Sequence, residues 1–284
     1  MKKMIDEMPI NKRQGFSAGV VKAGLWFYSS FTFLILIYMT YHSLRERKDI
    51  LGNTFGKPAK LTIGNYVKLI MEDEFFRYFA NSVIILVVSL ILLIFISSFT
   101  AYGIASYKFK GKKFMRIFFL IGLMFPVQLG IVPIFQLMKQ MNLINNITSV
   151  IIVSAAGISM PVFMLTDFFS KLPKEIYEAA VVDGAGEWRT FFKIMFPMAS
   201  PVVFSVCITS SVTIWNQFFL PLIFLQQDAN KTIPLLVVKY TKNLFSTIDS
   251  AMAVSTLSTV PILIIFIIFS SKILDGVTAG AVKG

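Results

Sequence analysis

Charged residues are scarce in this chain of 284 residues, at 15% of the sequence, whereas 56% of its residues are hydrophobic. An ordinary soluble domain has about a quarter charged residues, so this composition excludes that class and indicates a membrane protein. The few charges also leave six long windows without Asp, Glu, Lys or Arg. These windows are Gly24–Leu44, Ala80–Tyr107, Ile117–Met138, Gln140–Thr166, Ile194–Gln227 and Ser250–Ser271.

Cysteine and histidine are almost absent. The single cysteine, Cys207, excludes an intrachain disulfide, and the single histidine, His42, leaves no metal cluster to propose. A phosphate-binding loop of the form G-x-x-x-x-G-K-[ST] is also missing, and no cofactor is expected in this chain. If the function requires ATP, another subunit must bind it. The charge-free windows argue against an ion-coupled carrier, which usually needs ionisable groups inside the membrane, and they favour an uncharged substrate.

Each window is long enough to cross a bilayer once. A hydrocarbon core of about 30 Å needs roughly 20 residues of helix, and backbone groups in lipid must be hydrogen-bonded internally. We therefore expect an all-α integral membrane protein with six transmembrane helices, the first of them retained rather than cleaved as a signal peptide. The expected spans are about 23–43, 81–105, 117–138, 148–169, 199–225 and 251–272.

The distribution of basic residues predicts the orientation. With the N-terminus inside, 16 Lys and Arg residues lie in cytoplasmic segments and 11 in outer ones, and the compact basic turn 107–116 weighs more than the long outer loop 44–79. Residues 1–22 and the tail 274–284 are then cytoplasmic and flank one transmembrane domain, 23–273. The net charge of +12 fits attraction to anionic lipid headgroups and does not indicate nucleic-acid binding.

The cytoplasmic loop 170–198, between spans four and five, is the most informative segment. Pro173 suits the first turn of a helix, Glu175 and Glu178 lie near its positive N-terminal end, and Gly184 is placed to end it as a C-terminal cap. Its small residues would let the surface of another protein approach closely. A second amphipathic run would lie along the membrane surface or pack on the bundle, with apolar residues at Trp188, Phe191, Phe192 and Met195.

The spacing within this loop resembles the EAA signature of ABC importer permeases. Glu178-Ala179-Ala180 is followed after three residues by Gly184, and after nine more by Ile194 and Phe196-Pro197, with Phe196 where the family usually has Leu. The resemblance implies a type I ABC importer permease fold with a cytoplasmic coupling helix. It also implies that an ABC ATPase dimer is contacted by Glu178, Ala179, Ala180, Asp183, Gly184, Ile194 and Pro197.

The C-terminal residues Gly276–Gly284 are similar to the tail of the MalG type of carbohydrate permease, with Val277 where that family has Leu. In that family the tail reaches between the ATPase subunits, which implies such a role for Thr278, Ala279, Gly280 and Lys283. The segments Leu61–Tyr66 and Arg77–Ser82, and Trp215-Asn216 with Pro221, also resemble it.

The resemblance implies the rest of the assembly. The chain would form half of a heterodimeric pore with a second, MalF-like permease in a bacterial-type cell membrane, which it would cross several times. A separate ATPase would hold ATP and Mg, an extracytoplasmic solute-binding protein would deliver a carbohydrate, either an oligosaccharide or a sugar derivative, and the chain itself would be no enzyme.

Neutral polar residues in span five form a candidate substrate path. Thr209, Thr213, Asn216 and Gln217 fall at i, i+4, i+7 and i+8 with Trp215 beside them. Amides and hydroxyls bind sugar hydroxyls, and an aromatic face packs on a sugar ring, but the same groups also hold membrane helices together. Both interpretations stay open, as they do for Gln128 in span three, between Pro126 and Pro133, where a break is expected.

Other functions remain as alternatives. The importer could carry a peptide, an amino acid or another solute, or the loop could be an interfacial hairpin without a partner. A secondary carrier would instead use an ion gradient to drive uptake, which would continue without ATP. A membrane scaffold would show no ATP-dependent uptake in a reconstituted complex.

Overall fold

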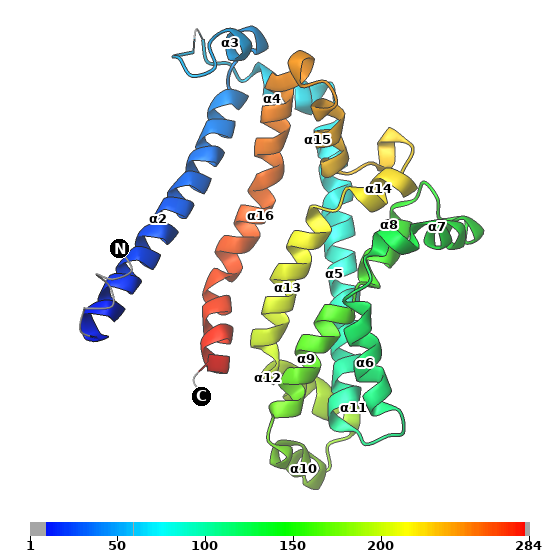
Figure 1. The fold of residues 1–284 in the computed structure, drawn as a ribbon. Helices are drawn as coiled ribbons and strands as arrows, with labels where there is room; N and C mark the ends of the chain where they lie inside the picture. The colour runs from blue at the N-terminus through cyan, green and yellow to red at the C-terminus, as the bar shows by residue number, and fades with distance from the viewer. Residues whose placement is uncertain (1–9, 59, 282–284) are drawn as a thin grey trace. The chain divides into compact units, whose positions relative to one another are not determined.

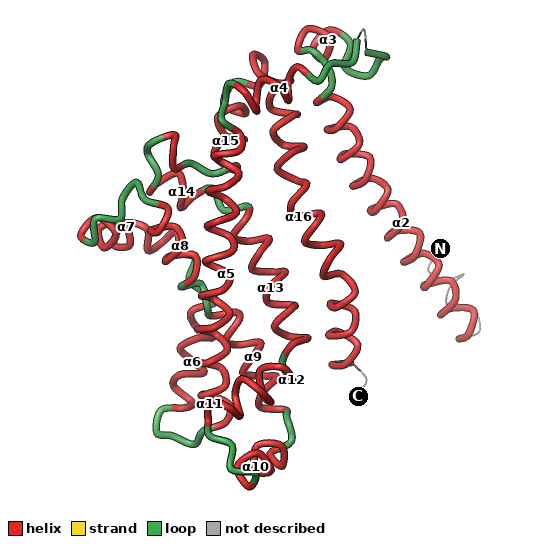
Figure 2. The backbone as a smooth tube through the Cα atoms, turned by 180° about the vertical axis from the view of Figure 1, so that it is seen from behind, coloured by secondary structure: helices red, strands yellow, loops and turns green. Residues whose placement is uncertain are grey.

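A computed structural model describes the backbone of residues 10–58 and 60–281, and the side chains of 18–58 and 60–268. Throughout these residues the regular elements are helices and no strand occurs, which confirms the all-α prediction (Figures 1 and 2). The chain divides into two compact units, one formed by residues up to 72 with 240–257 and the other by residues 73–239 with those from 258 onward.

The first unit contains α2 (Ile10–Ser43), α3 (Arg47–Gly52), α4 (Gly64–Met71) and the beginning of α16 (Leu244–Ala281). The second unit begins with α5 (Phe75–Ser106) and α6 (Lys112–Gly122). It continues with η1 (Val127–Gly130), α7 (Ile131–Gln140), α8 (Ile147–Ala155) and α9 (Ser159–Lys171). The loop after α9 holds α10 (Lys174–Val182), α11 (Glu187–Thr190), η2 (Phe191–Met195) and α12 (Phe196–Met198). The remaining elements are α13 (Ser200–Trp215), α14 (Phe219–Phe224), η3 (Asp228–Asn230), α15 (Ile233–Thr241) and the rest of α16.

Four helical segments are long and apolar enough to cross a membrane as single pieces. They are Ala18–Ser43, Phe75–Ser106, Ile147–Lys171 and Leu244–Ile268. Two bent pairs bring the number to six, in agreement with the six predicted spans, if each pair forms one span.

Span three is broken near Pro126, as the sequence predicts, whereas span five differs from the continuous helix expected. In span three, α6 ends at Gly122 and the chain bends by 94° into Val127–Gln140, because Pro126 has no N–H and disfavours a helical residue before it. Instead of one helix over 199–225, α13 ends at Trp215, and α14 starts at Phe219, whose backbone N–H donates to Gln217 Oε1 at 3.1 Å. A further bend of 73° separates Glu187–Met198 from α13.

Helix α5 lies at the centre of the second unit, where α8, α9 and α13 pack against it. Its buried face carries Ser82, Ser89, Ser97 and Ser98 among larger apolar residues. Small side chains let helix backbones approach closely in a membrane, and Ser89 Oγ donates to the carbonyl of Ile151 on α8 at 3.3 Å. The serines on this face therefore allow α8, α9 and α13 to pack closely against α5.

The turn before α8 is tied to the loop after α14 by one asparagine. Asn145 has a φ of 61°, a left-handed conformation that asparagine tolerates better than most residues. Its backbone N–H donates to Phe224 O at 2.7 Å, and its side-chain oxygen accepts from the Gln227 N–H at 2.9 Å. The Asn230 amide donates to its carbonyl at 2.6 Å, so backbone groups that no helix pairs are satisfied here.

In the first unit, the loop after α2 folds around Arg45, whose side chain is fully buried. The guanidinium donates to Asp49 Oδ2 at 2.7 Å and to Asn53 O at 2.7 Å, with longer bonds to the carbonyls of Asp49 and Thr54. The Asn65 amide donates to the carbonyls of Ser43 and Arg45 at 2.8 and 2.9 Å. One arginine thus satisfies the carbonyls of a short loop with little apolar core.

Arg45→Met should open this loop, because it removes the ion pair with Asp49 and all four hydrogen bonds that the guanidinium donates to the loop. Breaking a buried ion pair costs about 3 to 5 kcal/mol, so amide hydrogen exchange over residues 47–55 should become at least about a hundredfold faster. Lys48→Met, which removes an exposed charge from the neighbouring helix α3, is the matched control and should leave exchange unchanged. Equal exchange rates in both variants would contradict the role given to Arg45.

Candidate functional site

The helix expected in the cytoplasmic loop is present as α10, and its C-terminal end is closed as the sequence predicts. Gly184 has a φ of +72°, its N–H donates to Val181 O at 3.0 Å, and the Ala185 N–H donates to Ala180 O at 3.0 Å. This pair of bonds is a Schellman motif, in which glycine takes the left-handed position without the steric cost of a Cβ. At the other end, Pro173 is the N-cap residue and not part of the first turn.

Most of the predicted contact residues on α10 face solvent. Glu178, Ala179, Asp183 and Gly184 are exposed, and a Cβ at Gly184 would meet no atom within 4 Å. Ala180 differs from the expectation of an open small-residue face, since it is only 4% exposed and packs inside the loop. Val182, which the sequence analysis did not single out, is 86% exposed.

The second amphipathic run packs on the helix bundle. Phe191 and Met195 are buried with Leu165 and Phe169, whereas Trp188 and Phe192 remain exposed. The Phe99 ring of α5 lies 4.5 Å from the Phe191 ring centroid and 5.6 Å from that of Trp188.

The segment Phe191–Met195 forms a π-helical turn, in which the Phe196 N–H donates to Phe191 O. Turns of this kind are frequently found at functional sites. Of the two other predicted contact residues, Ile194 packs against the buried cluster around Phe191, and Pro197 is exposed on α12.

A carboxylate missed by the sequence analysis joins this loop to α5. Glu187 Oε1 accepts from the Tyr177 hydroxyl at 2.6 Å, and Glu187 Oε2 accepts from the Tyr102 hydroxyl at 3.2 Å and from that of Tyr107. Tyr177 is on α10, Tyr102 on α5 and Tyr107 directly after α5. We call these four residues the Glu187 cluster. Because each tyrosine comes from a different segment, one charge holds the loop to the membrane helix.

The cluster shifts the pKa values of those of its members that lie outside the transmembrane segment. The hydroxyls of Tyr107 and Tyr177 lower the pKa of Glu187, since they stabilise its charged form. Burial, with the hydrogen bond to Glu187, raises the pKa of Tyr107 to about 12, and the same carboxylate raises the pKa of Tyr177. Because the pKa of Glu187 is lower in the folded state than in the unfolded state, its carboxylate stabilises the fold at any pH above the ordinary pKa of glutamate. This contribution is lost as the pH falls through the lowered pKa.

The stripe predicted in span five is divided between two pockets. Thr209, Thr213 and Gln217 line a pocket of about 300 Å³ together with residues of α5, α8 and α9. Both threonine hydroxyls donate to carbonyls of their own helix at 2.9 Å, which leaves their lone pairs as acceptors. The Gln217 oxygen already accepts from the Phe219 N–H, so its NH₂ group is the donor available to a ligand.

Asn216 and Trp215 line a separate pocket with Ser258. Trp215 is only 3% exposed and its indole N–H donates to Ser258 O at 3.0 Å, so its ring packs in the core of the second unit. Gln128 is exposed on η1 and does not line either pocket. The structure therefore brings together three of the six candidate path residues.

The tail residues lie at the limit of what the structure describes. Helix α16 includes the backbone of Thr278, Ala279 and Gly280, whereas their side chains and Lys283 lie outside the described residues. Within the part of the chain that the structure describes, no group of three or more His, Cys, Asp or Glu side chains could hold a metal ion.

Comparisons with known proteins bear on this geometry. Residues 93–276 match the family model described as "Binding-protein-dependent transport system inner membrane component". The chain is 32% identical over 270 residues to the diacetylchitobiose uptake system permease protein NgcG of Streptomyces coelicolor, covering 94% of this chain and 89% of that one. It is 33% identical to the arabinooligosaccharides transport system permease protein AraQ of Halalkalibacterium halodurans, covering 88% and 90%.

A third relative is the trehalose/maltose transport system permease protein MalG of Thermococcus litoralis, with 31% identity over 87% of this chain and 90% of the relative. The fold matches a crystal structure of a bacterial ABC transporter involved in the import of the acidic polysaccharide alginate, with a TM-score of 0.74 at 19% identity, covering 93% of this chain and 99% of that one. With the matched region and these relatives extending over most of its length, the chain belongs to the binding-protein-dependent transport system inner membrane component family.

Proposed function

We propose that the chain is one half of a heterodimeric pore in an ATP-driven importer of a carbohydrate, either an oligosaccharide or a sugar derivative. The observation that carries this proposal is the identity of about a third, over most of the chain, with permeases named for diacetylchitobiose and arabinooligosaccharides. We place the protein in a bacterial-type cell membrane, with an extracytoplasmic solute-binding protein on its outer face and a second, MalF-like permease beside it.

The energy would come from a separate ABC ATPase dimer that holds ATP and Mg, so the chain itself catalyses no reaction. The exposed side of α10, with Glu178, Ala179, Asp183 and Gly184, supports the contact with that dimer. Thr278, Ala279, Gly280 and Lys283 would add a second contact. Force received at α10 would pass to α5 through the Glu187 cluster and through Phe191 and Met195.

The substrate path would include the pocket lined by Thr209, Thr213 and Gln217. Its acceptor oxygens and its amide donor complement the hydroxyls of a neutral sugar, which both donate and accept hydrogen bonds. Hydrophobic residues such as Leu93 and Met164 supply the remaining walls.

Uptake by the full complex in proteoliposomes tests this function. With labelled oligosaccharide and the binding protein outside, uptake should require ATP inside and should stop with a non-hydrolysable analogue. It should be unaffected by ionophores that collapse ion gradients. Uptake driven by an ion gradient without ATP would contradict the importer, and uptake of peptides in place of sugars would contradict the cargo.

Gly184→Asn tests whether the end of α10 docks on the ATPase. Asparagine tolerates the left-handed conformation, so the helix should keep its cap, but its side chain would occupy the open space above Gly184. We expect normal insertion and a loss of at least about tenfold in the ATPase activity stimulated by loaded binding protein, equivalent to roughly 1.4 kcal/mol of coupling.

Gly111→Asn is the matched control, because Gly111 also has a positive φ, of +97°, and an open Cβ position, but lies in the turn before α6. Stimulated ATPase activity should be normal in this variant. Normal stimulation in Gly184→Asn as well would overturn the docking proposal.

Tyr177→Phe removes the hydroxyl that links α10 to Glu187 and leaves the ring in place. We expect more ATP to be hydrolysed per solute taken up, because the link between α10 and α5 is weakened. The increase should be about two- to fivefold, since one charge-assisted hydrogen bond in a solvent-facing cluster contributes little more than a neutral one. Tyr41→Phe, in the first unit, removes a hydroxyl bonded to Gly56 O and serves as a control. An unchanged ratio of ATP to solute in Tyr177→Phe would show that the Glu187 cluster does not transmit force.

A further inference from the structure

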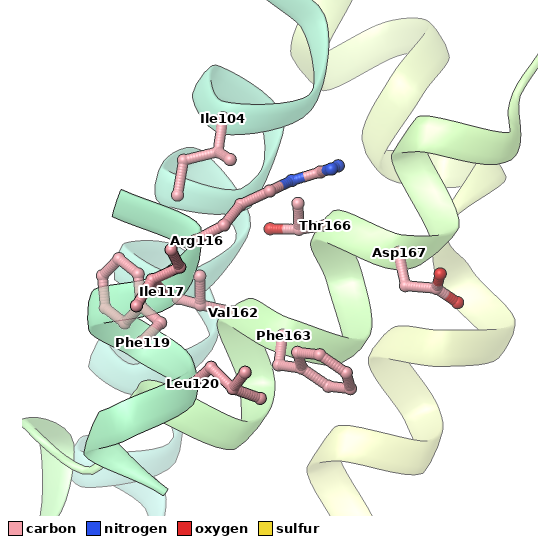
Figure 3. Close-up of a pocket in the computed structure, with 9 residues that line it drawn as sticks. All are labelled: Ile104, Arg116, Ile117, Phe119, Leu120, Val162, Phe163, Thr166 and Asp167. Carbon is pink, nitrogen blue, oxygen red and sulfur yellow. The ribbon is translucent and has the colours of Figure 1, made fainter. Parts of the chain in front are cut away.

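A pocket of about 230 Å³ lies between α5, α6 and α9, near the end of the second unit where the cytoplasmic turn 107–111 connects α5 to α6 (Figures 1 and 3). Three polar side chains, Arg116, Thr166 and Asp167, share it with apolar ones. The apolar lining consists of Ile104, Ile117, Phe119, Leu120, Val162 and Phe163. This pocket is separate from the one lined by Thr209 and Thr213, and neither the coupling loop nor the proposed path uses it.

The Thr166 hydroxyl is the first sign that a ligand belongs here. The side chain is only 6% exposed, and its oxygen has no hydrogen-bond partner among the described residues. Figure 3 shows this oxygen directed toward the side of the pocket formed by Arg116 and Val162. Burying a hydroxyl without a partner is unfavourable, and the great majority of buried polar groups in proteins have one. A bound molecule with an acceptor oxygen would provide it.

The charge around the pocket indicates the sign of that molecule. Arg116 is exposed at the pocket, and its Nη2 donates to Ser170 Oγ at 2.6 Å, which uses one of the five guanidinium N–H groups. Lys108 and Lys110 on the turn and Lys113 at the start of α6 are exposed, and residues 107–116 contain no acidic residue. The pocket's own carboxylate, Asp167, is paired with Lys171 at 2.8 Å, which offsets its repulsion of an anion.

An anion next to an apolar pocket at the membrane surface is the chemistry of an acidic lipid. Guanidinium groups bind phosphate oxygens with two parallel hydrogen bonds, and basic sites between membrane helices on the cytoplasmic side hold anionic headgroups. A free phosphate ion would satisfy Arg116 but would leave the six apolar side chains uncovered. A neutral apolar molecule would cover them but would leave Thr166 without a partner.

We propose that this pocket binds an anionic glycerophospholipid of the cytoplasmic leaflet. Its phosphate lies on Arg116, an ester oxygen of its glycerol accepts from the Thr166 hydroxyl, and one acyl chain lies against Phe119, Leu120, Val162 and Phe163. The lipid bridges α6 and α9 and so fastens the first half of the bent span three to the helix that leads into the coupling loop.

Native mass spectrometry of the intact transporter complex, purified in mild detergent, tests this site. With added phosphatidylglycerol, the wild-type complex should retain the lipid at a midpoint concentration at least about tenfold lower than for phosphatidylcholine. Arg116→Gln should remove most of this preference and Thr166→Val should weaken the retention of both lipids, whereas Lys108→Gln, close in the chain but outside the pocket, should change neither. Equal retention of both lipids, or of phosphatidylglycerol in all variants, would overturn the proposal.

Thermal unfolding of the same complexes separates the lipid from other occupants. Phosphatidylglycerol should raise the melting temperature of the wild type and not that of Thr166→Val, and inorganic phosphate should have no such effect. If phosphate alone reproduces the rise, the site binds free anions and the lipid proposal is wrong. If Thr166→Val is more stable than the wild type with phosphatidylglycerol present, the hydroxyl has no lipid partner and the proposal is also wrong.

Discussion

The constraint on which this structure depends is that a backbone in lipid must satisfy its own N–H and C=O groups. Long helices meet this requirement in α5 and in the α8–α9 pair, and the buried serines of α5 let those helices pack closely. Where the helices break, side chains take over. Gln217 accepts from the first residue of α14, Asn145 bridges two connections, and Trp215 donates to a carbonyl of α16. These polar residues therefore stabilise the fold through hydrogen bonds to backbone groups.

Side chains also hold the end of the second unit that carries α10. The loop 170–198 is rich in apolar residues, but within α10 only Ala180 is buried. Its position is set instead by the Glu187 cluster and by the aromatic stack of Phe99 and Phe191. A loop held in this way can be compact while the outward side of α10, with Gly184 and Val182, stays exposed. The loop therefore has one face that anchors it to α5 and another that is open to solvent.

The sequence predicted those features that depend on neighbouring residues. Gly184 ended the helix as expected because a left-handed cap is a local preference of glycine, and charge-free windows located the apolar helices. It did not predict the Glu187 cluster, since Tyr102 and Glu187 are far apart in the chain and meet only after α5 and the loop have packed. For the same reason the burial of Ala180 and Trp215 could not be read from helical periodicity. The bend in span three was signalled by Pro126, but its size depends on packing.

The π-helical turn at Phe191–Met195 has a consequence for how the loop and span five are aligned. Successive residues of an α-helix advance by about 100° around the axis, and a π-helical turn accommodates one residue more than the α register does. Deleting a single residue from this turn would restore the α-helical register and rotate everything before it by about that angle relative to α13. The rotation of α10 about the axis of α13 therefore depends on the number of residues in this segment. When relatives are compared, the length of the segment is as informative as its composition.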